Sequence, residues 1–199
     1  ITLPHMAEEK QAQWLAEIMG ASGEVFAAEG AAIAGGHTTI GAELVVGFTV
    51  TGTADTAMIL SGAQEGDALI LTRPIGVGTL LAAEMEMRAD GDDVAAMLDT
   101  LMTPQGDAAR VLADVAHAMT DVTGFGLAGH AARMAEASGL SVEVRLADVP
   151  AFRGAEALVE QGVRSTIWPA NRAAVVAEVP NTAKGALLFD PQTAGGLLA

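Results

Sequence analysis

The chain has 199 residues, 51% of them hydrophobic but only 4% aromatic, so the core of one or two domains must be built from Ala, Val, Leu and Met. Its net charge of −15 argues against nucleic acid as a partner, because a phosphate backbone needs a basic face. The absence of cysteine excludes disulfides and cysteine-ligated metals, and with no apolar run of membrane length and no leader-like segment a cytoplasmic protein is expected.

Periodicity and turn residues divide the chain into alternating helices and strands. Helices are expected where apolar residues recur every three or four positions, and strands where β-branched residues cluster between Gly or Pro. In chain order the sequence predicts helix 6–19 with a second piece to about 29, strand 31–34, strand 44–53, strand 67–72, helix 79–87, a helix after the acidic turn 90–93, helix 104–117, helix 126–138, strand 141–146, helix 155–161 and strand 186–189. This alternation indicates an α/β to α+β fold.

Small and acidic residues set several of the expected element ends. Gly20 and Gly23 are expected to break or bend the first helix. Asp92 or Asp93 is expected to cap the helix that follows the acidic turn. Little pattern is present in the connector before the strand at 67–72, so a domain boundary is expected near residues 55–66.

Residues 119–130 read MTDVTGFGLAGH and carry the strongest site signal. Asp121 lies between two threonines, and a Gly-x-Gly turn leads directly into an Ala-rich helix. A carboxylate there can bind a hard cation such as Mg²⁺, while free backbone N–H groups at the helix start can bind a phosphate. An N-cap or turn carboxylate is the alternative that the residues leave open for Asp121. His130, inside the helix, is expected to be a packed histidine.

Two further glycine-rich stretches flank this motif. Gly35, Gly36 and His37 follow the strand predicted at 31–34 and can present backbone N–H groups to a phosphate, although an isolated Gly pair is more often an ordinary tight turn. Residues 190–196 read DPQTAGG, for which a structural turn is the preferred interpretation. Arg73, next to a proline, is expected either to contact an anion or to be a surface cation.

Together with LTRPIG at 71–76, these stretches resemble the selenide, water dikinase (selenophosphate synthetase) family of the aminoimidazole ribonucleotide synthetase-like superfamily. That family carries a GGH-type turn, T-[KR]-P-[LI]-G, T-D-V-T-G-F-G-L-x-G-H and D-P-Q-T-[SA]-G-G-L-L, in this order. The resemblance extends over essentially the whole chain, but to only part of the family's length. Residues 38–41, TTIG, depart from the acidic residues that follow GGH in many members.

The resemblance implies two domains. Residues 1–60 would be the second half of an N-terminal ATP-binding and dimerisation domain, and 61–199 an α+β C-terminal domain truncated at its end. It also implies that Asp121 is a Mg²⁺ ligand and that the turn at 35–37 contacts ATP. Since the protein is strongly acidic, ATP would have to arrive with divalent cations.

By resemblance, the activity is phosphoryl transfer from ATP to selenide, with water, releasing AMP and phosphate and making selenophosphate. A homodimer is implied as well. The family's reactive Cys or selenocysteine and nearby Lys lie on a Gly-rich N-terminal loop that is not in this chain. No catalytic residue is therefore assigned, and the chain is expected to be a fragment that is inactive alone.

Two alternatives to this function remain open. The chain could belong to another ATP-dependent member of the superfamily, such as a thiamine-monophosphate kinase or a hydrogenase-maturation protein. It could also be a non-catalytic dimerisation or regulatory module, for example joined to an oxidoreductase. The T-D-V-T-G-F-G-L-x-G-H string favours the dikinase.

Overall fold

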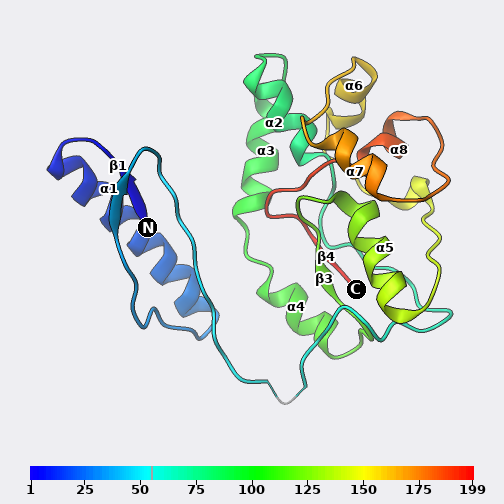
Figure 1. The fold of residues 1–199 in the computed structure, drawn as a ribbon, viewed down its shortest axis with the longest axis horizontal. Helices are drawn as coiled ribbons and strands as arrows, with labels where there is room; N and C mark the ends of the chain where they lie inside the picture. The colour runs from blue at the N-terminus through cyan, green and yellow to red at the C-terminus, as the bar shows by residue number, and fades with distance from the viewer. Residues whose placement is uncertain (55) are drawn as a thin grey trace. The chain divides into compact units, whose positions relative to one another are not determined.

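The structure, a computed structural model, describes residues 1–54 and 56–199. It divides into two compact units, Ile1–Thr56 and Ala57–Ala199, each of which is described by itself (Figure 1). The division falls in the stretch where the sequence predicts a boundary, of which residue 55 lies outside the described residues. That the first unit is part of an ATP-binding and dimerisation domain stays a prediction.

The first unit contains one long helix and a short parallel ladder. Helix α1 (Glu8–Ala28) is continuous, and β1 (Thr2–Pro4) pairs in parallel with β2 (Thr39–Gly41). The predicted break at Gly20 and Gly23 is wrong, because a glycine costs a helix interior only about 1 kcal/mol relative to Ala and good helix formers lie on both sides. No helix in the described ranges is both long and apolar enough to cross a membrane.

Neither strand predicted between residues 31 and 53 forms. Residues 31–34 have no regular structure, so the turn at 35–37 precedes β2 instead of following a strand. Within 44–53, Val45 bridges to Thr2, and most side chains of this segment are exposed. A β-branched sequence forms a strand only where a neighbouring strand pairs with it. The three-residue β1 pairs with this segment at one residue, Thr2, which is too little to form a strand.

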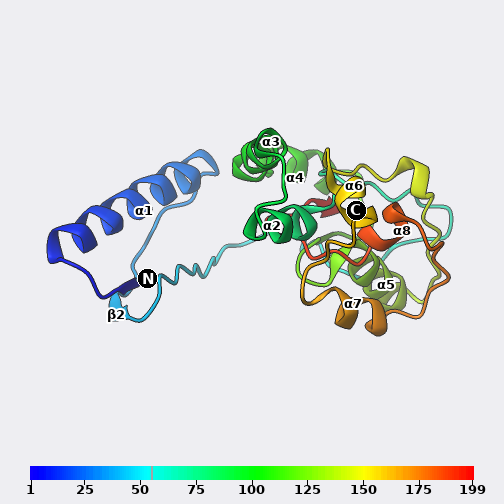
Figure 2. The same cartoon turned by 90° about the horizontal axis from the view of Figure 1, so that it is seen from above.

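The second unit surrounds a small antiparallel ladder with short helices. Strand β3 (Thr120–Asp121) pairs with β4 (Leu197–Leu198), Thr120 opposite Leu198, and residues 70–72 run along the other side of 197–199 (Figure 1). Figure 2 shows α2 (Val77–Met85) and α3 (Gly91–Met102) side by side in this unit. Its elements are α2 (Val77–Met85), α3 (Gly91–Met102), α4 (Gly106–Ala113), β3 (Thr120–Asp121), α5 (Gly126–Ser138), η1 (Leu146–Asp148), α6 (Ala155–Glu160), α7 (Trp168–Ala174), α8 (Ala183–Leu187) and β4 (Leu197–Leu198).

Local turn and cap chemistry accounts for several helix ends. The helix predicted at 126–138 is confirmed as α5, and Gly139 ends it in the left-handed conformation, with φ of 68°. Helix α3 is capped by Asp90, whose side chain accepts hydrogen bonds from the N–H groups of Asp92 and Asp93. The prediction that one of the two later aspartates is the cap is therefore wrong, because both already lie in the first turn.

Three predicted strands of this unit differ from the structure. Residues 186 and 187 end α8, which starts after the Thr182 cap, and 188 and 189 form the turn that follows, because a short apolar run fits a buried helix as well as a strand. Residues 141–146 form no strand, and no described strand pairs with them. The strand predicted at 67–72 pairs only over its last residues, beside 197–199.

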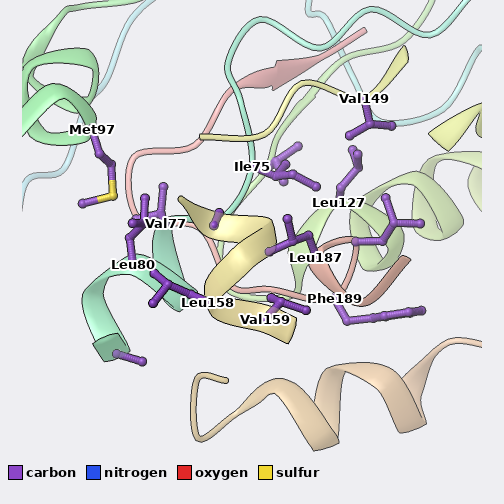
Figure 3. Packing of buried hydrophobic residues seen from close by; sticks show 14 of the residues in the cluster. Ile75, Val77, Leu80, Met97, Leu127, Val149, Leu158, Val159, Leu187 and Phe189 are labelled. Atoms are coloured by element: carbon purple, nitrogen blue, oxygen red, sulfur yellow. The ribbon is translucent and has the colours of Figure 1, made fainter. Parts of the chain in front are cut away.

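An apolar core of the second unit lies between α2, α6 and α8. Figure 3 shows Val77, Leu80 and Leu158 gathered between α2 and α6, with Leu187 and Phe189 close by. These side chains are almost completely buried, and each contributes about 2 kcal/mol by leaving water. Aliphatic residues supply most of this core, as the composition indicates.

Candidate metal and phosphate site

The DPQT motif holds the start of α2. Asp190 is fully buried, and its carboxylate accepts hydrogen bonds from the Gly78 N–H (2.9 Å) and the Thr79 hydroxyl (2.7 Å). Gln192 Oε1 accepts the N–H groups of Gly76 and the residue after it, at 3.2 and 3.3 Å. These N–H groups have no partner inside the helix. The contacts agree with the structural role expected for residues 190–196.

Burial raises the pKa of Asp190 to about 6, because loss of water outweighs the hydrogen bonds from Thr79, Gln192 and Gly78. In the unfolded chain this carboxyl ionises near its usual value of 3.8. Between these two values the folded state holds a proton that the unfolded state has lost. The Asp190 contribution to stability is therefore greatest below the unfolded pKa and falls as pH rises through the folded pKa.

We expect the Asp190→Asn variant to lose this pH dependence. The free energy of unfolding of the wild type should lose about 3 kcal/mol from this group as pH rises from about 3 to about 7. The amide can donate to Thr79 Oγ1 and still accept from Gly78, so the variant should fold. Urea unfolding across this pH range checks the difference, with the exposed Asp99→Asn as control. If the free energy of unfolding changed with pH in the same way for the wild type and Asp190→Asn, the result would contradict this role of Asp190.

Asp121 is presented to solvent by the strand that anchors it. Its neighbour Val122 is fully buried and donates its N–H to the Gly196 carbonyl (2.8 Å), so alternation along the strand turns Asp121 outward. Among the described residues, none donates a hydrogen bond to the Asp121 carboxylate. The N-cap of α5 is Phe125, without a side-chain cap. The N-cap alternative for Asp121 is therefore wrong.

The turn after Asp121 is tied to its surroundings through Thr123. The Thr123 N–H donates to His130 Nε2 (3.0 Å), and its carbonyl accepts from the Gln192 N–H (3.0 Å). Gly126 adopts φ of 72°, and a Cβ there would lie 2.8 Å from the Leu188 carbonyl oxygen. Only glycine fits this position, which brings the turn close to the segment before DPQT.

His130 and Phe125 meet on the outer side of this turn. Their ring centroids are 5.8 Å apart, and the half-buried His130 is packed as expected, whereas Phe125 is exposed. Burial is the main cause that lowers the pKa of His130, and Asp121 opposes this effect through its negative charge. A neutral imidazole can accept the Thr123 N–H.

Asn171, which the sequence did not indicate, holds the inner side of the turn. It is buried in α7, and its side-chain amide donates to the carbonyls of Gly124 (2.8 Å) and Phe189 (3.0 Å). The sequence signal is an amide in a short helix made mostly of apolar residues, where a buried polar group needs partners. The sequence does not indicate that the partner is the Gly124 carbonyl, 47 residues away.

Arg73 fulfils neither of its two expected roles. Its side chain is buried, and the guanidinium donates to the carbonyls of Ala194 (2.7 Å) and Thr103. Burial lowers the pKa of Arg73. The residue ties the glycine-rich end of the DPQTAGG motif to the end of α3, and so it is neither a surface cation nor placed for an anion.

The turn at Gly35, Gly36 and His37 belongs to the first unit, whereas Asp121 belongs to the second. Both glycines are exposed, and nothing lies within 4 Å of the position of a Cβ on either. The His37 carbonyl accepts from the N-terminal amine at 2.8 Å. A role for this turn in binding ATP stays a prediction.

The described residues offer Asp121 as a single oxygen ligand. They contain no group of three or more His, Asp or Glu side chains placed to hold a metal ion. An exposed carboxylate that accepts no hydrogen bond from the residues in the described ranges can fill one ligand position of a hard cation such as Mg²⁺. The rest of such a coordination shell would come from phosphate oxygens and water, which Mg²⁺ commonly retains.

Comparison with known proteins identifies the family. Residues 64–188 match the family model described as "AIR synthase related protein, C-terminal domain", and the chain belongs to this family. Its curated relatives include the selenide, water dikinase of Paraburkholderia xenovorans, 38% identical over 92% of this chain and 54% of the relative. That of Geobacter metallireducens is 40% identical, over 94% and 56%. The predicted resemblance is confirmed, and the chain spans about half the length of these relatives.

A solved structure supports the fold class. The structure described as "AaThiL complexed with AMPPCP and TMP" aligns with 99% of this chain and 58% of its own, with a TM-score of 0.61 and 16% identity. At this identity the likeness concerns the fold alone. The predicted α/β to α+β class is confirmed, although several of the predicted strands are not.

Proposed function

We propose that the chain serves in the synthesis of selenophosphate from ATP, selenide and water, with release of AMP and phosphate, as part of a selenide, water dikinase. The observation that carries this proposal is the Asp121 carboxylate, exposed and without a hydrogen-bond donor among the described residues, on a turn held by buried contacts. Relatives 38% and 40% identical to the chain bear the dikinase name.

Asp121 would hold one coordination position of Mg²⁺ beside the ATP phosphates. When bound, the cation supplies charge stabilisation to the phosphoryl group in transfer. The acidic character of the chain, −15 overall, makes a cation necessary if a triphosphate is to approach a carboxylate. Backbone N–H groups of Gly35 and Gly36 would contact phosphate, as paired glycines can. The chain contains no cysteine to act on selenide.

Phosphorus NMR with ATP, Mg²⁺ and selenide tests this function. The chain alone should give no selenophosphate signal. A hybrid enzyme, which joins this chain to the part of the P. xenovorans relative that the chain does not cover, should give one. A hybrid that turns over thiamine monophosphate instead would support the other superfamily function, and a selenophosphate signal from the chain alone would refute the assignment of no catalytic residue.

We further propose that the chain forms a homodimer in the cytoplasm. Residues 44–50 of the first unit expose several apolar side chains, among them Val45 and Val50 at 57% and 72% exposure. Such an extended apolar segment can pair with a second copy. Light scattering should give twice the monomer mass of 20.1 kDa. The Val50→Asp variant should give a lower mass, because a charge in the paired segment weakens the dimer. A monomer at micromolar concentration would contradict the dimer.

A further inference from the structure

His130 contacts the Asp121 turn through one defined atom. Its Nε2 lies 3.0 Å from the Thr123 backbone N and 3.3 Å from Thr123 Oγ1. A backbone N–H can only donate, so Nε2 must carry a lone pair, and the proton of the neutral ring must be on Nδ1. The imidazole thus accepts from the residue two positions after Asp121.

The other contacts of this turn come from fixed parts of the fold. The Val122 side chain is in the core and its N–H is bonded to Gly196, while the Thr123 carbonyl accepts from Gln192. The Thr123 N–H points away from these groups and toward α5, where it donates to His130. Without His130 this N–H has no described acceptor, and the backbone next to Asp121 loses the hydrogen bond that holds it on the α5 side.

We propose that His130 is a positioning residue for Asp121 and acts through the Thr123 backbone. The proposal rests on the proposed function, in which Asp121 binds a divalent cation. A cation ligand binds best when its carboxylate is already held in place, and groups that orient a ligand commonly contribute about tenfold or more to metal affinity. His130 orients the backbone that carries the ligand and touches neither cation nor phosphate.

The test compares two variants of the ¹⁵N-labelled chain. His130→Phe keeps a ring beside Phe125 but removes the acceptor, whereas the side-chain oxygen of His130→Gln can take the place of Nε2. In His130→Phe, amide exchange at Thr123 should rise about tenfold. Paramagnetic broadening near Asp121 by Mn²⁺ alone should need about tenfold more Mn²⁺. His130→Gln should restore both, and every variant should remain folded at the temperature of the measurement.

The imidazole itself provides an independent readout. Ring ¹⁵N shifts of His130 should report the tautomer with the proton on Nδ1, and the proton on Nε2 would overturn the proposal. Unchanged Thr123 exchange in His130→Phe, or failure of His130→Gln to restore it, would overturn it too.

The variant Asp121→Asn separates the two claims. Loss of Mn²⁺ broadening in Asp121→Asn but not in His130→Phe overturns the role of His130 and leaves the proposed function intact. Equal broadening in Asp121→Asn and the wild type overturns the metal role of Asp121, and with it the positioning role. In that case Thr123 exchange and the tautomer still decide whether the His130 contact exists.

Discussion

Replacing Asp121 with Asn should lower ATP turnover by the hybrid enzyme by orders of magnitude and leave its melting temperature nearly unchanged. The amide keeps the shape of the side chain but loses the negative charge that a cation needs, and metal charge stabilisation is worth several kcal/mol in the transition state. Stability should not suffer, because the carboxylate is exposed and accepts no hydrogen bond from the described residues. Phosphate release and thermal unfolding measure both quantities on one sample.

The exposed Asp99→Asn serves as the matched control, since it removes the same charge from α3. Its turnover should equal that of the wild type, which excludes an effect of net charge alone. Near-normal turnover in Asp121→Asn would contradict the metal assignment.

Replacing Gly195 with Ala should destabilise the second unit by about 3 kcal/mol. The added Cβ would overlap the Val122 carbonyl oxygen and lie 2.8 Å from the Gln192 Cβ. A backbone oxygen cannot move aside as the end of a flexible side chain can. The melting temperature should fall by about 10 °C, and the Asp121 strand should shift with Val122.

Gly124 provides the control for this substitution, because it lies in the same turn region and nothing lies within 4 Å of its Cβ position. Its backbone φ is not in the left-handed region. Gly124→Ala should therefore change the melting temperature little. Equal melting temperatures for the Gly195 and Gly124 variants would show that the close approach of the two motifs is not as described.

Elements that could be predicted from the sequence are those whose local signals agree. The α5 helix has an apolar period and a glycine stop at Gly139, and both signals place its end correctly. By contrast, β-branched or apolar content predicts strands at 44–53 and 186–189, and neither strand forms. Strand formation depends on a partner elsewhere in the chain, and a short apolar run also fits a helix.

In the candidate site, too, the local motifs can be predicted from the sequence, whereas the contacts between them cannot. The motifs around Asp121 and Asp190 are visible in the sequence, but their contact through Thr123 and Gln192 joins residues 69 positions apart and depends on the fold. The roles of Arg73 and Asn171 are likewise set by distant carbonyl groups. The residue type indicates that a buried polar group needs hydrogen-bond partners. Which groups these partners are is determined by the tertiary structure.

The central claim, that Asp121 binds a divalent cation beside the ATP phosphates, is tested most directly by magnetic resonance of Mn²⁺ in the hybrid enzyme. With a non-hydrolysable ATP analogue and aspartate labelled with ¹³C at the carboxylate, the Mn²⁺ signal should show coupling to both ³¹P and a carboxylate ¹³C. In Asp121→Asn the phosphorus coupling should persist and a carboxylate coupling should disappear. Identical spectra for the two proteins would contradict the claim.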